Sequence, residues 1–459
     1  MADSPPSRLP LVVSPSNRDE TTNKDAKLIN GFIEQVSQEE IWVYKRPGLS
    51  SYTSASAAAA GGVYNWKGNI YAIWGATLYK DNVAVTGTVD STGGVYTFSS
   101  CLGATQKLFF QNGVKAYTYD PANGIVQVTD VDYPATTVKG QAYLDGTTYV
   151  MDSTANIYGS GINDPQSWDP LNKLVAQIEP DGGVFTMKQL VYVVAFKQWS
   201  VEIFYDAGNA TGSPLGTVQG AKVNVGCRSA ESVKELEGTI FWVAQARGGS
   251  PSVWMMENLK AQQISTPAIE KLLQQADYTT VYSWTARSAG HKFYVVTLVG
   301  SNLTLVFDLT SRRWYQWTDA SGNYLPIVSS TFTPDDQPIL QHASNGKIYR
   351  FDIAYANDDG SLIVWDLYTP NWDGGTRKIK YLHSMDLISD QTSGSILQVR
   401  NTDDDYQTYT NFRTVDLGNK RPRLTQCGSF RRRAYHFRHA CNTPLRIQAI
   451  EMQVEAGTL

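Results

Sequence analysis

Short runs of apolar residues separated by turn-forming residues recur along most of the chain. In segments such as KLFFQNGVKAYTYD and LVFDLTSRRWYQW, an apolar run reaches Asn, Gly or Asp and a second run follows. Runs of this kind, bounded by turn residues, are typical of β-strands joined by tight turns. The dipeptides Asn112–Gly113, Asp145–Gly146 and Asn345–Gly346 provide residues that adopt the positive φ of such turns. The pattern therefore predicts successive β-hairpins.

The hairpins repeat at a spacing of about 35 to 54 residues, the length of one supersecondary unit in a repeat protein. Their first strands begin near seven positions: Asn69, Lys107, Ala142, Leu190, Thr239, Lys292 and Ile339. This spacing matches one four-stranded blade per repeat. The sequence therefore predicts an all-β fold built on a β-propeller of six or seven blades.

Aromatic residues followed by Asp end the second strand of several repeats. These steps are Tyr119–Asp120, Tyr205–Asp206, Phe307–Asp308 and Phe351–Asp352. Trp314, Tyr315 and Trp317 follow one of them closely. A blade cannot bury both of its faces alone, so we expect large flat side chains to pack between neighbouring blades. The alternative for the Trp–Tyr–x–Trp cluster is a platform on which a ligand stacks.

One segment, STPAIEKLLQQAD, has the pattern of a short α-helix. Thr266 is the expected N-cap, Pro267 takes the first helical position, and Glu270 lies in the first turn. Four apolar residues share one face at helical spacing: Ile269, Leu272, Leu273 and Ala276. We expect this helix to pack on the rim of the propeller.

The composition changes at both ends of the repeats. Residues 1–40 contain several prolines and the polar stretch SNRDETTNKD, a pattern typical of an extended arm. From about Asn371 tryptophan becomes rare, and the chain ends in LRIQAIEMQVEA, whose alternation indicates a half-exposed strand. We predict an N-terminal arm with the first strand over 1–50, the propeller over 51–370, and an additional C-terminal β module over 371–459.

Composition and charge narrow the class of protein. Charged residues make up 18% of the chain and aromatic residues 12%, which agrees with an all-β fold. The formal net charge of −4 disfavours a free nucleic-acid-binding protein. Between Arg377 and Arg446, however, 13 Lys and Arg stand against 6 Asp and Glu. The C-terminal module is therefore the basic part of the chain.

The cysteines and the lengths of the apolar runs indicate where the protein is located. The four cysteines are too scattered for a metal knuckle or a disulfide framework, and they fit a reducing compartment. The N-terminus lacks the pattern of a signal peptide, and no apolar run reaches the length of a membrane span. We expect a soluble protein that is not exported through a signal peptide.

The sequence provides no motif for a catalytic centre. HExxH, G-x-S-x-G and phosphate-binding Gly–Lys patterns are all missing, so we predict no enzyme and no catalytic, cofactor or metal residues. His436 and His439 are three positions apart on an expected strand and would point to opposite faces. Four aspartates are candidates for a glycosidase pair, although Asp is also a common turn residue: Asp164, Asp169, Asp308 and Asp352. The acidic run Asp403–Asp405 lacks EF-hand spacing, and we interpret it as a solvated loop tip.

The segment FRRRAYHFRHAC, residues 430–441, is the most distinctive polar feature. Alternating Arg and aromatic residues can contact nucleic acid, form a protein interface, or cover apolar surface on a solvated strand. On a strand, Arg432, His436 and Arg438 would share one face. We favour the protein interface, and the candidate contact residues are Arg431, Arg432, Arg433, Tyr435 and Arg438.

Four stretches together resemble a known family. They are NGFIEQVSQEEIWVYKRPGLSSY (30–52), GGVFTMKQLVYVVAFKQWSVEIFYDAG (182–208), STPAIEKLLQ (265–274) and GSFRRRAYHFRHACNTPLRIQAIEMQVE (428–455). In order and spacing they resemble the packaged-DNA stabilisation, or tail hub and nozzle, proteins of short-tailed bacteriophages. The resemblance covers nearly the whole chain. It implies a propeller-bearing structural subunit of the virion tail, assembled in the host cytoplasm, that forms a homo-oligomeric ring, commonly a hexamer.

The same resemblance implies partners but transfers no catalytic residues and no cofactor. The ring would sit below the portal and its adaptor, contact tailspikes or tail fibres and a needle or plug, and retain the packaged genome until ejection. Genomic DNA would pass through the lumen without sequence-specific binding. Because basic contacts would slow its passage, we expect most of Arg431–Arg433 to face protein. The alternatives are a glycan-binding tail adhesin that stacks sugars on Trp199 or Trp314, and a glycosidase.

Overall fold

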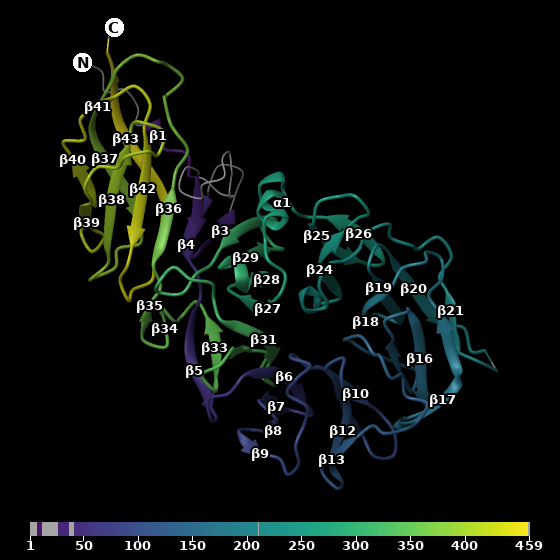
Figure 1. Cartoon of the computed structure of the whole chain (residues 1–459). Helices are drawn as coiled ribbons and strands as arrows, with labels where there is room; N and C mark the ends of the chain where they lie inside the picture. The colour runs from purple at the N-terminus through teal and green to yellow at the C-terminus, as the bar shows by residue number, and fades with distance from the viewer. Residues whose placement is uncertain (1–6, 12–25, 36–40, 210, 458–459) are drawn as a thin grey trace. The chain divides into compact units, whose positions relative to one another are not determined.

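The computed structural model describes residues 7–11, 26–35, 41–209 and 211–457, and their regular elements are almost all β-strands joined by turns and loops (Figure 1). The chain divides into two compact units. The first unit comprises Met1–Ser50, Arg287–Leu325 and Phe351–Leu459, and the second comprises Ser51–Ala286 and Pro326–Arg350. The domain boundaries predicted at residues 50 and 370 therefore stay a prediction.

The propeller consists of successive antiparallel sheets in chain order. Four have four strands each: β6 (Ala60–Trp66), β7 (Asn69–Trp74), β8 (Thr77–Lys80) and β9 (Val83–Ala84); β10 (Thr97–Cys101), β11 (Lys107–Gln111), β12 (Ala116–Asp120) and β13 (Gly124–Gln127); β14 (Ala142–Leu144), β15 (Thr147–Met151), β16 (Asn156–Gly161) and β17 (Asp164–Val175); β18 (Gly183–Gln189), β19 (Tyr192–Lys197), β20 (Val201–Asp206) and β21 (Leu215–Thr217). A five-stranded sheet follows: β22 (Gly226–Cys227), β23 (Lys234–Leu236), β24 (Thr239–Gln245), β25 (Ser252–Glu257) and β26 (Lys260–Gln263).

Two larger sheets continue the series. One begins with β27 (Val281–Ser288), β28 (His291–Leu298), β29 (Leu303–Asp308) and β30 (Arg313–Gln316). The other contains β31 (Ile327–Phe332), β32 (Pro338–His342), β33 (Lys347–Asp352), β5 (Gly48–Ser54), β34 (Asn357–Asp358) and β35 (Ser361–Leu362). The prediction of an all-β propeller is confirmed.

Hydrogen bonds link the first strands of successive sheets around the axis of the second unit. They join Trp66 Nε1 to Ser100 Oγ, Thr97 Oγ1 to Gln141 Oε1, Thr186 N to Lys139 O, Gln189 Nε2 to Gly238 O, Thr285 Oγ1 to Glu235 O, Thr285 N to Ser330 Oγ and Asn65 N to Thr331 Oγ1. Both ends of this series meet on β31. These hydrogen bonds therefore close the circle of inner strands within this unit.

Aromatic and aliphatic cores fill the spaces between neighbouring sheets, as the sequence predicts. Between β6–β9 and β10–β13, Tyr71 and Trp66 pack on Tyr119, with ring centroids 5.5 and 6.1 Å apart. Between β18–β21 and β22–β26, Phe196 packs edge-on against Trp242 at 5.3 Å. These contacts are the buried surface that a single blade cannot provide for itself.

The Trp–Tyr–x–Trp cluster of the first unit is also a packing element. Trp314, Tyr315 and Trp317 are each at most 1% exposed. Trp317 lies 5.8 Å from Phe351, and its Nε1 donates to the carbonyl oxygen of Gly31. The cluster therefore packs within and between sheets. A sugar cannot stack on Trp314, which removes one of the two residues on which the adhesin alternative rests.

The Asp that follows each aromatic residue organises the turn after the strand. Asp120 accepts the backbone N–H of Ala122 at 2.9 Å, and Asp352 accepts that of Ala354 at 2.8 Å. Asp206 and Asp308 make the equivalent bond to the residue two positions on. A carboxylate in this place satisfies donors that the turn leaves without a backbone partner.

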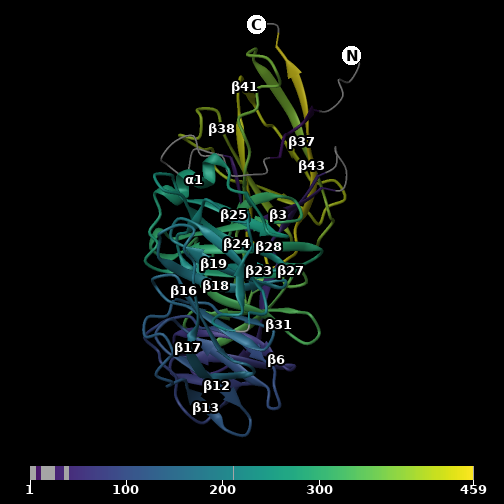
Figure 2. The same cartoon turned by 90° about the vertical axis from the view of Figure 1, so that its right-hand side faces the viewer.

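The first unit adds strands from both ends of the chain. One sheet contains β1 (Ser7–Arg8), β3 (Gly31–Gln35), β4 (Ile41–Lys45), β37 (Lys380–Ser389), β40 (Arg423–Thr425), β41 (Ser429–Phe430) and β43 (Arg446–Ala456). β37 and β43 form its long antiparallel pair, visible side by side in Figure 2. A second group of strands continues the β27–β30 sheet: β2 (Lys27–Ile29), β36 (Trp365–Tyr368), β42 (Ala434–His439), β38 (Ile396–Thr402) and β39 (Arg413–Asp416).

The N-terminal arm differs from the prediction over its described part. Residues 1–6, 12–25 and 36–40 lie outside the described residues, but Ser7–Arg8 pairs with β43, and Leu9 is buried. Lys27–Ile29 pairs antiparallel with β36. These segments are strands of the chain's own sheets because apolar side chains such as Leu28 and Phe32 supply buried surface that the polar stretch before them lacks.

The helix α1 (Pro267–Gln274) forms at the predicted position, and Ile269 and Leu273 are its buried residues. The expected cap is wrong in one respect. Thr266 takes the N-cap position with an extended backbone, but its hydroxyl makes no capping hydrogen bond. The Ser265 hydroxyl instead donates to Glu270 at 3.0 Å, so Ser265 contacts the first-turn acid. Two short 3₁₀ turns, η1 (Ala230–Ser232) and η2 (Val299–Ser301), complete the described helices.

Candidate functional site

The basic segment Arg431–Arg433 lies beside the acidic segment Asp403–Asp405. Arg433 makes a two-pronged pair with Asp403, with Nε–Oδ1 and Nη2–Oδ2 distances of 2.7 and 2.8 Å, and Arg432 pairs with Asp405. The Arg433 guanidinium also lies 4.5 Å from the ring centre of Phe430. The acidic run lies in a turn with Asp403 and Asp404 exposed, as predicted for a solvated loop tip, and two of its acids also provide the counter-charge of the basic run.

The middle acid of the run, Asp404, organises its own loop. Its carboxylate accepts the Thr408 hydroxyl and backbone N–H, the Thr402 hydroxyl at 2.7 Å, and the N–H of Gln407 at 3.1 Å. These hydrogen bonds hold the pKa of Asp404 below its ordinary value. The loop that presents Asp403 and Asp405 to the arginines is thus fixed by hydrogen bonds of its own.

A second ion pair joins β42 to β36. Asp366 accepts Arg438 Nε at 2.8 Å and Nη2 at 3.1 Å, and it also contacts His436 Nε2 at 2.6 Å. Arg400 Nε donates to His436 Nδ1 at 2.9 Å, so the histidine is neutral and donates from Nε2 to Asp366. Burial lowers the pKa of His436, in agreement with this tautomer. Burial alone would raise the pKa of Asp366, but its hydrogen bonds from His436 and Arg438 hold it below the ordinary value.

Aromatic rings surround this pair. Tyr368 stacks on the His436 ring with centroids 3.9 Å apart. Arg400 lies over Tyr409 and Phe412, at 4.4 and 4.5 Å from their ring centres. Such cation–π contacts hold a guanidinium in place without an acid. Arg400 and Arg438 therefore form contacts within the module.

The predicted interface residues fall into two groups. Arg431 is exposed, and Arg432 and Arg438 are partly exposed, so the interface hypothesis stays a prediction for these three. Arg433 and Tyr435 are buried within their own chain, where they stabilise the module and are not accessible to another protein. Arg431 and Arg432 precede β42, so the face alternation expected for a strand applies only from Ala434 onward.

Sequence reasoning missed the partners of these arginines. Asp366 and Arg400 were unremarkable residues in their own segments, and the acidic run containing Asp403 was not linked to the arginines. The one available signal was the presence of two triplets of opposite charge, Asp403–Asp405 and Arg431–Arg433, in one module. Opposite charge alone does not show that the two triplets pair. They pair only because the strands of the module bring their loops together.

Arg46, from the first stretch that carries the family resemblance, forms a buried hydrogen-bond centre. It is 1% exposed and pairs with Asp358, with Nη1–Oδ1 at 3.0 Å. Its Nε donates to Asn30 Oδ1 at 3.0 Å, and Asn30 Nδ2 in turn donates to Thr318 Oγ1 at 2.8 Å. This network joins segments more than 250 residues apart in sequence. Asn30 and Arg46 are therefore structural residues of the first unit.

The four candidate glycosidase aspartates have local structural roles. Asp164 pairs with Lys107 at 3.1 Å, and Asp169 accepts the N–H of Leu171 at 2.8 Å. Asp308 is buried against His291, at 2.7 Å, and Asp352 belongs to a turn. Throughout the described ranges, no group of three or more His, Cys, Asp or Glu could hold a metal ion. In the same residues no helix is long and apolar enough to cross a membrane.

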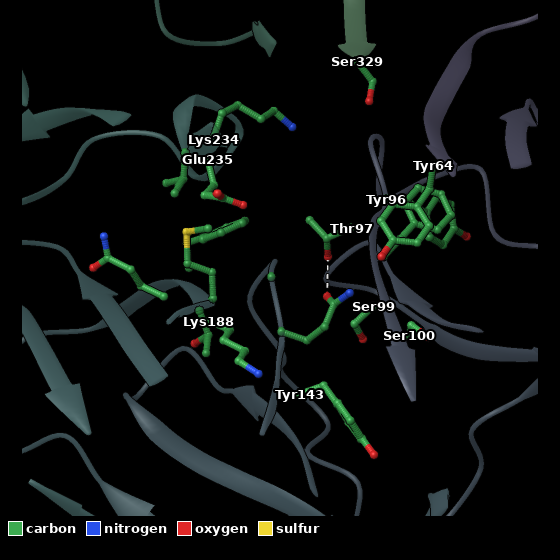
Figure 3. A pocket seen from close by; sticks show the side chains of 18 of the residues that line it. Tyr64, Tyr96, Thr97, Ser99, Ser100, Tyr143, Lys188, Lys234, Glu235 and Ser329 are labelled. Atoms are coloured by element: carbon green, nitrogen blue, oxygen red, sulfur yellow. Dashed lines mark hydrogen bonds between the residues drawn. The ribbon is translucent and has the colours of Figure 1, made fainter. Parts of the chain in front are cut away.

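A hollow of the second unit lies among the first strands of its sheets (Figure 3). It has a volume of about 670 Å³ and is lined by the first strands of several sheets. Its walls combine aromatic side chains such as Tyr64 and Phe98 with hydroxyl groups, and with the charged residues Lys188, Lys234 and Glu235. No sequence motif indicated this cavity because its residues come one or two at a time from separate strands.

Comparisons with solved structures found weak similarities. The structures similar to the chain include a streptogramin B lyase (TM-score 0.42, 9% identity, 66% of this chain and 96% of that chain). A virginiamycin B lyase from Staphylococcus aureus has a TM-score of 0.42 at 7% identity, covering 64% of this chain and 94% of that one. The WD40 β-propeller domain of Doa1 has a TM-score of 0.40 at 9% identity, covering 66% and 97%. Similarity at this level does not indicate a shared function.

No curated protein sequence matches the chain. A sequence-family model described as bacteriophage P22 Gp10, β-propeller, matches residues 27–324. This range is well over half of the chain and includes Asn30, Arg46 and the sheets from β6 to β30. The chain therefore belongs to the phage stabilisation family of bacteriophage P22 Gp10, whose members are β-propeller structural proteins of bacteriophages.

Proposed function

We propose that the chain is a tail hub or nozzle subunit that forms a ring below the portal and adaptor, continues the DNA channel and retains the packaged genome. The observation that carries this proposal is the family match over residues 27–324. In this role the protein needs a rigid body and complementary surfaces. It needs no reacting groups, so we propose that it is not an enzyme.

The packing of the chain supports a rigid part. The inner strands of the second unit close on themselves through Thr285 and Ser330, and large side chains fill the spaces between its sheets. Close-packed interiors deform little, because any shift forfeits many contacts at once. A subunit built this way can transmit force along a tail without changing shape.

The distribution of basic residues supports passage of DNA without tight binding. Arg433, Arg438 and Arg46 are held by carboxylates of the same chain. Each phosphate contact adds salt-dependent affinity, so arginines already paired inside the protein contribute little to DNA binding. The exposed Arg431 is then available for a protein partner.

The proposed partners are those of a hub: further copies of the chain, commonly six in a ring, the adaptor and portal, tailspikes or tail fibres, and a needle or plug. We propose that assembly takes place in the host cytoplasm and that the mature protein resides in the virion. Electrostatic complementarity between the basic C-terminal sheets and an acidic adaptor surface would set the docking orientation.

Native mass spectrometry of the full chain mixed with its adaptor ring tests the proposal. We expect a closed ring of defined copy number, weakened by Arg431→Glu and unchanged by the matched reversal Lys260→Glu on the exposed end of β26. A chain that stays monomeric with the adaptor at micromolar concentration contradicts the proposal. A ring that forms equally well with Arg431→Glu contradicts the interface assignment alone.

A further inference from the structure

The cavity among the first strands of the second unit has the size and lining of a small-molecule site. At about 670 Å³ it falls within the range typical of ligand pockets, roughly 300 to 1,000 Å³. Its lining includes the apolar side chains of Phe98, Phe185 and Met187 and the polar side chains of Thr97, Gln141 and Lys234. Figure 3 shows Thr97 and Lys234 among the residues that line it. An occupant that complements both kinds of side chain has an apolar body and at least one polar head.

The formal charge of the lining is positive. Lys234 from β23 and Lys188 from β18 both line the cavity, and neither takes part in an ion pair within the described ranges. The acid on the same wall, Glu235, accepts the N–H of Gly238 at 2.6 Å. Glu231 forms an ion pair with Lys139 at 2.7 Å. The two lysines are thus the charged donors that the cavity offers to an occupant.

Three buried side chains in the wall have polar atoms without a partner. The Thr97 hydroxyl donates to Gln141 Oε1, and Gln141 Nε2 is left as a donor with nothing to bind. Gln189 donates to Gly238 O and Met256 O, and its Oε1 is unpartnered. Thr186 Oγ1 is likewise unpartnered. All three residues are more than nine-tenths buried, where an unsatisfied polar atom costs about 1–3 kcal/mol.

We propose that this cavity binds a small organic anion, with its carboxylate or phosphate group at Lys234 and its apolar body against Phe98 and Met187. Lys188 on β18 is the second cationic donor in the lining. Gln141 Nε2, Thr186 Oγ1 and Gln189 Oε1 have almost no accessible surface, so they contact an occupant only if their side chains rotate toward it. Charge-assisted hydrogen bonds from Lys234 give this end of the cavity its selectivity for anions. This site is independent of ring assembly, so an empty cavity would leave the proposed tail function intact.

Isothermal titration of the full chain at pH 7 with benzoate and phenyl phosphate tests the proposal. Benzyl alcohol serves as the neutral probe of similar shape, and inorganic phosphate as the acid group without the apolar body. We expect both organic anions to bind at least about tenfold more tightly than benzyl alcohol, and inorganic phosphate to bind more weakly than phenyl phosphate.

Lys234→Met removes the charge and keeps the side-chain stem, and it should weaken benzoate binding about tenfold or more. The matched control Lys260→Met lies on β26, outside the cavity, and should leave binding unchanged. If Lys234→Met fails to fold, Lys188→Met replaces it, with an expected loss of at least about threefold. Failure of both organic anions to bind, unchanged affinity in these variants, or an experimental map that shows only ordered water in the cavity overturns the proposal.

Discussion

The two units of this chain stabilise their sheets in different ways. In the second unit, apolar and aromatic side chains fill the spaces between sheets, and its buried charges pair locally: Lys197 contacts Asp181 and Glu202, all nearby in sequence. In the first unit, ion pairs connect distant segments. The buried Arg46 pairs with Asp358, 312 residues away, and the partly exposed Arg438 pairs with the buried Asp366, 72 residues away. The stability of the second unit depends mainly on the repeated apolar packing between its sheets. The stability of the first unit depends on ion pairs between distant segments.

This contrast predicts different responses to mutation, salt and pH. Truncating an apolar side chain removes contact surface, and its cost is nearly independent of salt and pH. Removing one member of a buried ion pair leaves a charge without compensation, and its cost changes with the partner's charge state. The following predictions use these differences, from the largest effect to the smallest.

Trp242→Ala in the second unit should have the largest effect. Trp242 is fully buried between two sheets, and truncation of such a residue costs about 3–5 kcal/mol in the free energy of unfolding. Urea denaturation followed by circular dichroism measures this loss, which should be the same at low and high salt. Trp242→Phe keeps an aromatic ring but loses the hydrogen bond from Nε1 to Gly226 O, so it should cost clearly less. Equal costs for the two variants would contradict the packing account.

Arg46→Met in the first unit should cost about 3 kcal/mol, because Asp358 is left nearly buried and unpaired. The double variant Arg46→Met with Asp358→Asn removes the uncompensated charge and should recover part of the loss. A double-mutant cycle on the same urea transitions gives the coupling energy. Additive effects of the two substitutions would show that this ion pair does not hold the segments together.

Acid should destabilise the first unit through His439. Burial lowers the pKa of His439 to about 3, while the unfolded chain titrates near its ordinary value of about 6.5. The folded state stays neutral as the unfolded state takes up a proton. Stability is therefore complete above pH 6.5 and falls as the pH drops from 6.5 toward 3.

The loss between pH 7.5 and pH 5 should be about 1–2 kcal/mol, read from unfolding midpoints at the two pH values. His439→Gln should flatten this dependence. His383→Gln, a matched change at an exposed histidine, should leave it unaltered. A pH dependence that persists in full without His439 would assign the effect to other groups.

Arg431→Ala should have the smallest effect on folding, below about 0.5 kcal/mol, because the side chain is exposed. Arg433→Ala, two residues on, should cost more, since it leaves Asp403 without its partner and exposes Phe430. Thermal unfolding of the two variants at equal concentration measures the difference. If both variants unfold like the natural chain, the Asp403–Asp405 loop is not held by the arginines.

Local patterns were enough to predict much of the fold. The apolar runs, the turn dipeptides and the aromatic–Asp steps placed the hairpins, since each signal lies within a few residues of the strand that it defines. Helix α1 was predicted from its Pro, its first-turn Glu and its apolar face. The missing Thr266 cap depends on a side-chain rotation that these signals do not determine.

The pairing of distant residues was beyond sequence reasoning. Nothing near Arg433 indicates that Asp403 meets it, and nothing near Gln141 indicates that Gln189 shares its cavity. These relations arise from the order of strands in sheets and from closure of the inner circle of strands. The strands formed by Ser7–Arg8 and Lys27–Ile29 were missed for the same reason: their partners are hundreds of residues away.

A cryo-EM reconstruction of the tail of a virion that contains this chain tests the central claim most directly. The account predicts several copies, commonly six, in one closed ring below the portal, with DNA or its channel on the ring axis and Arg431 at a protein contact. A single peripheral copy, or a location away from the DNA channel, would contradict it.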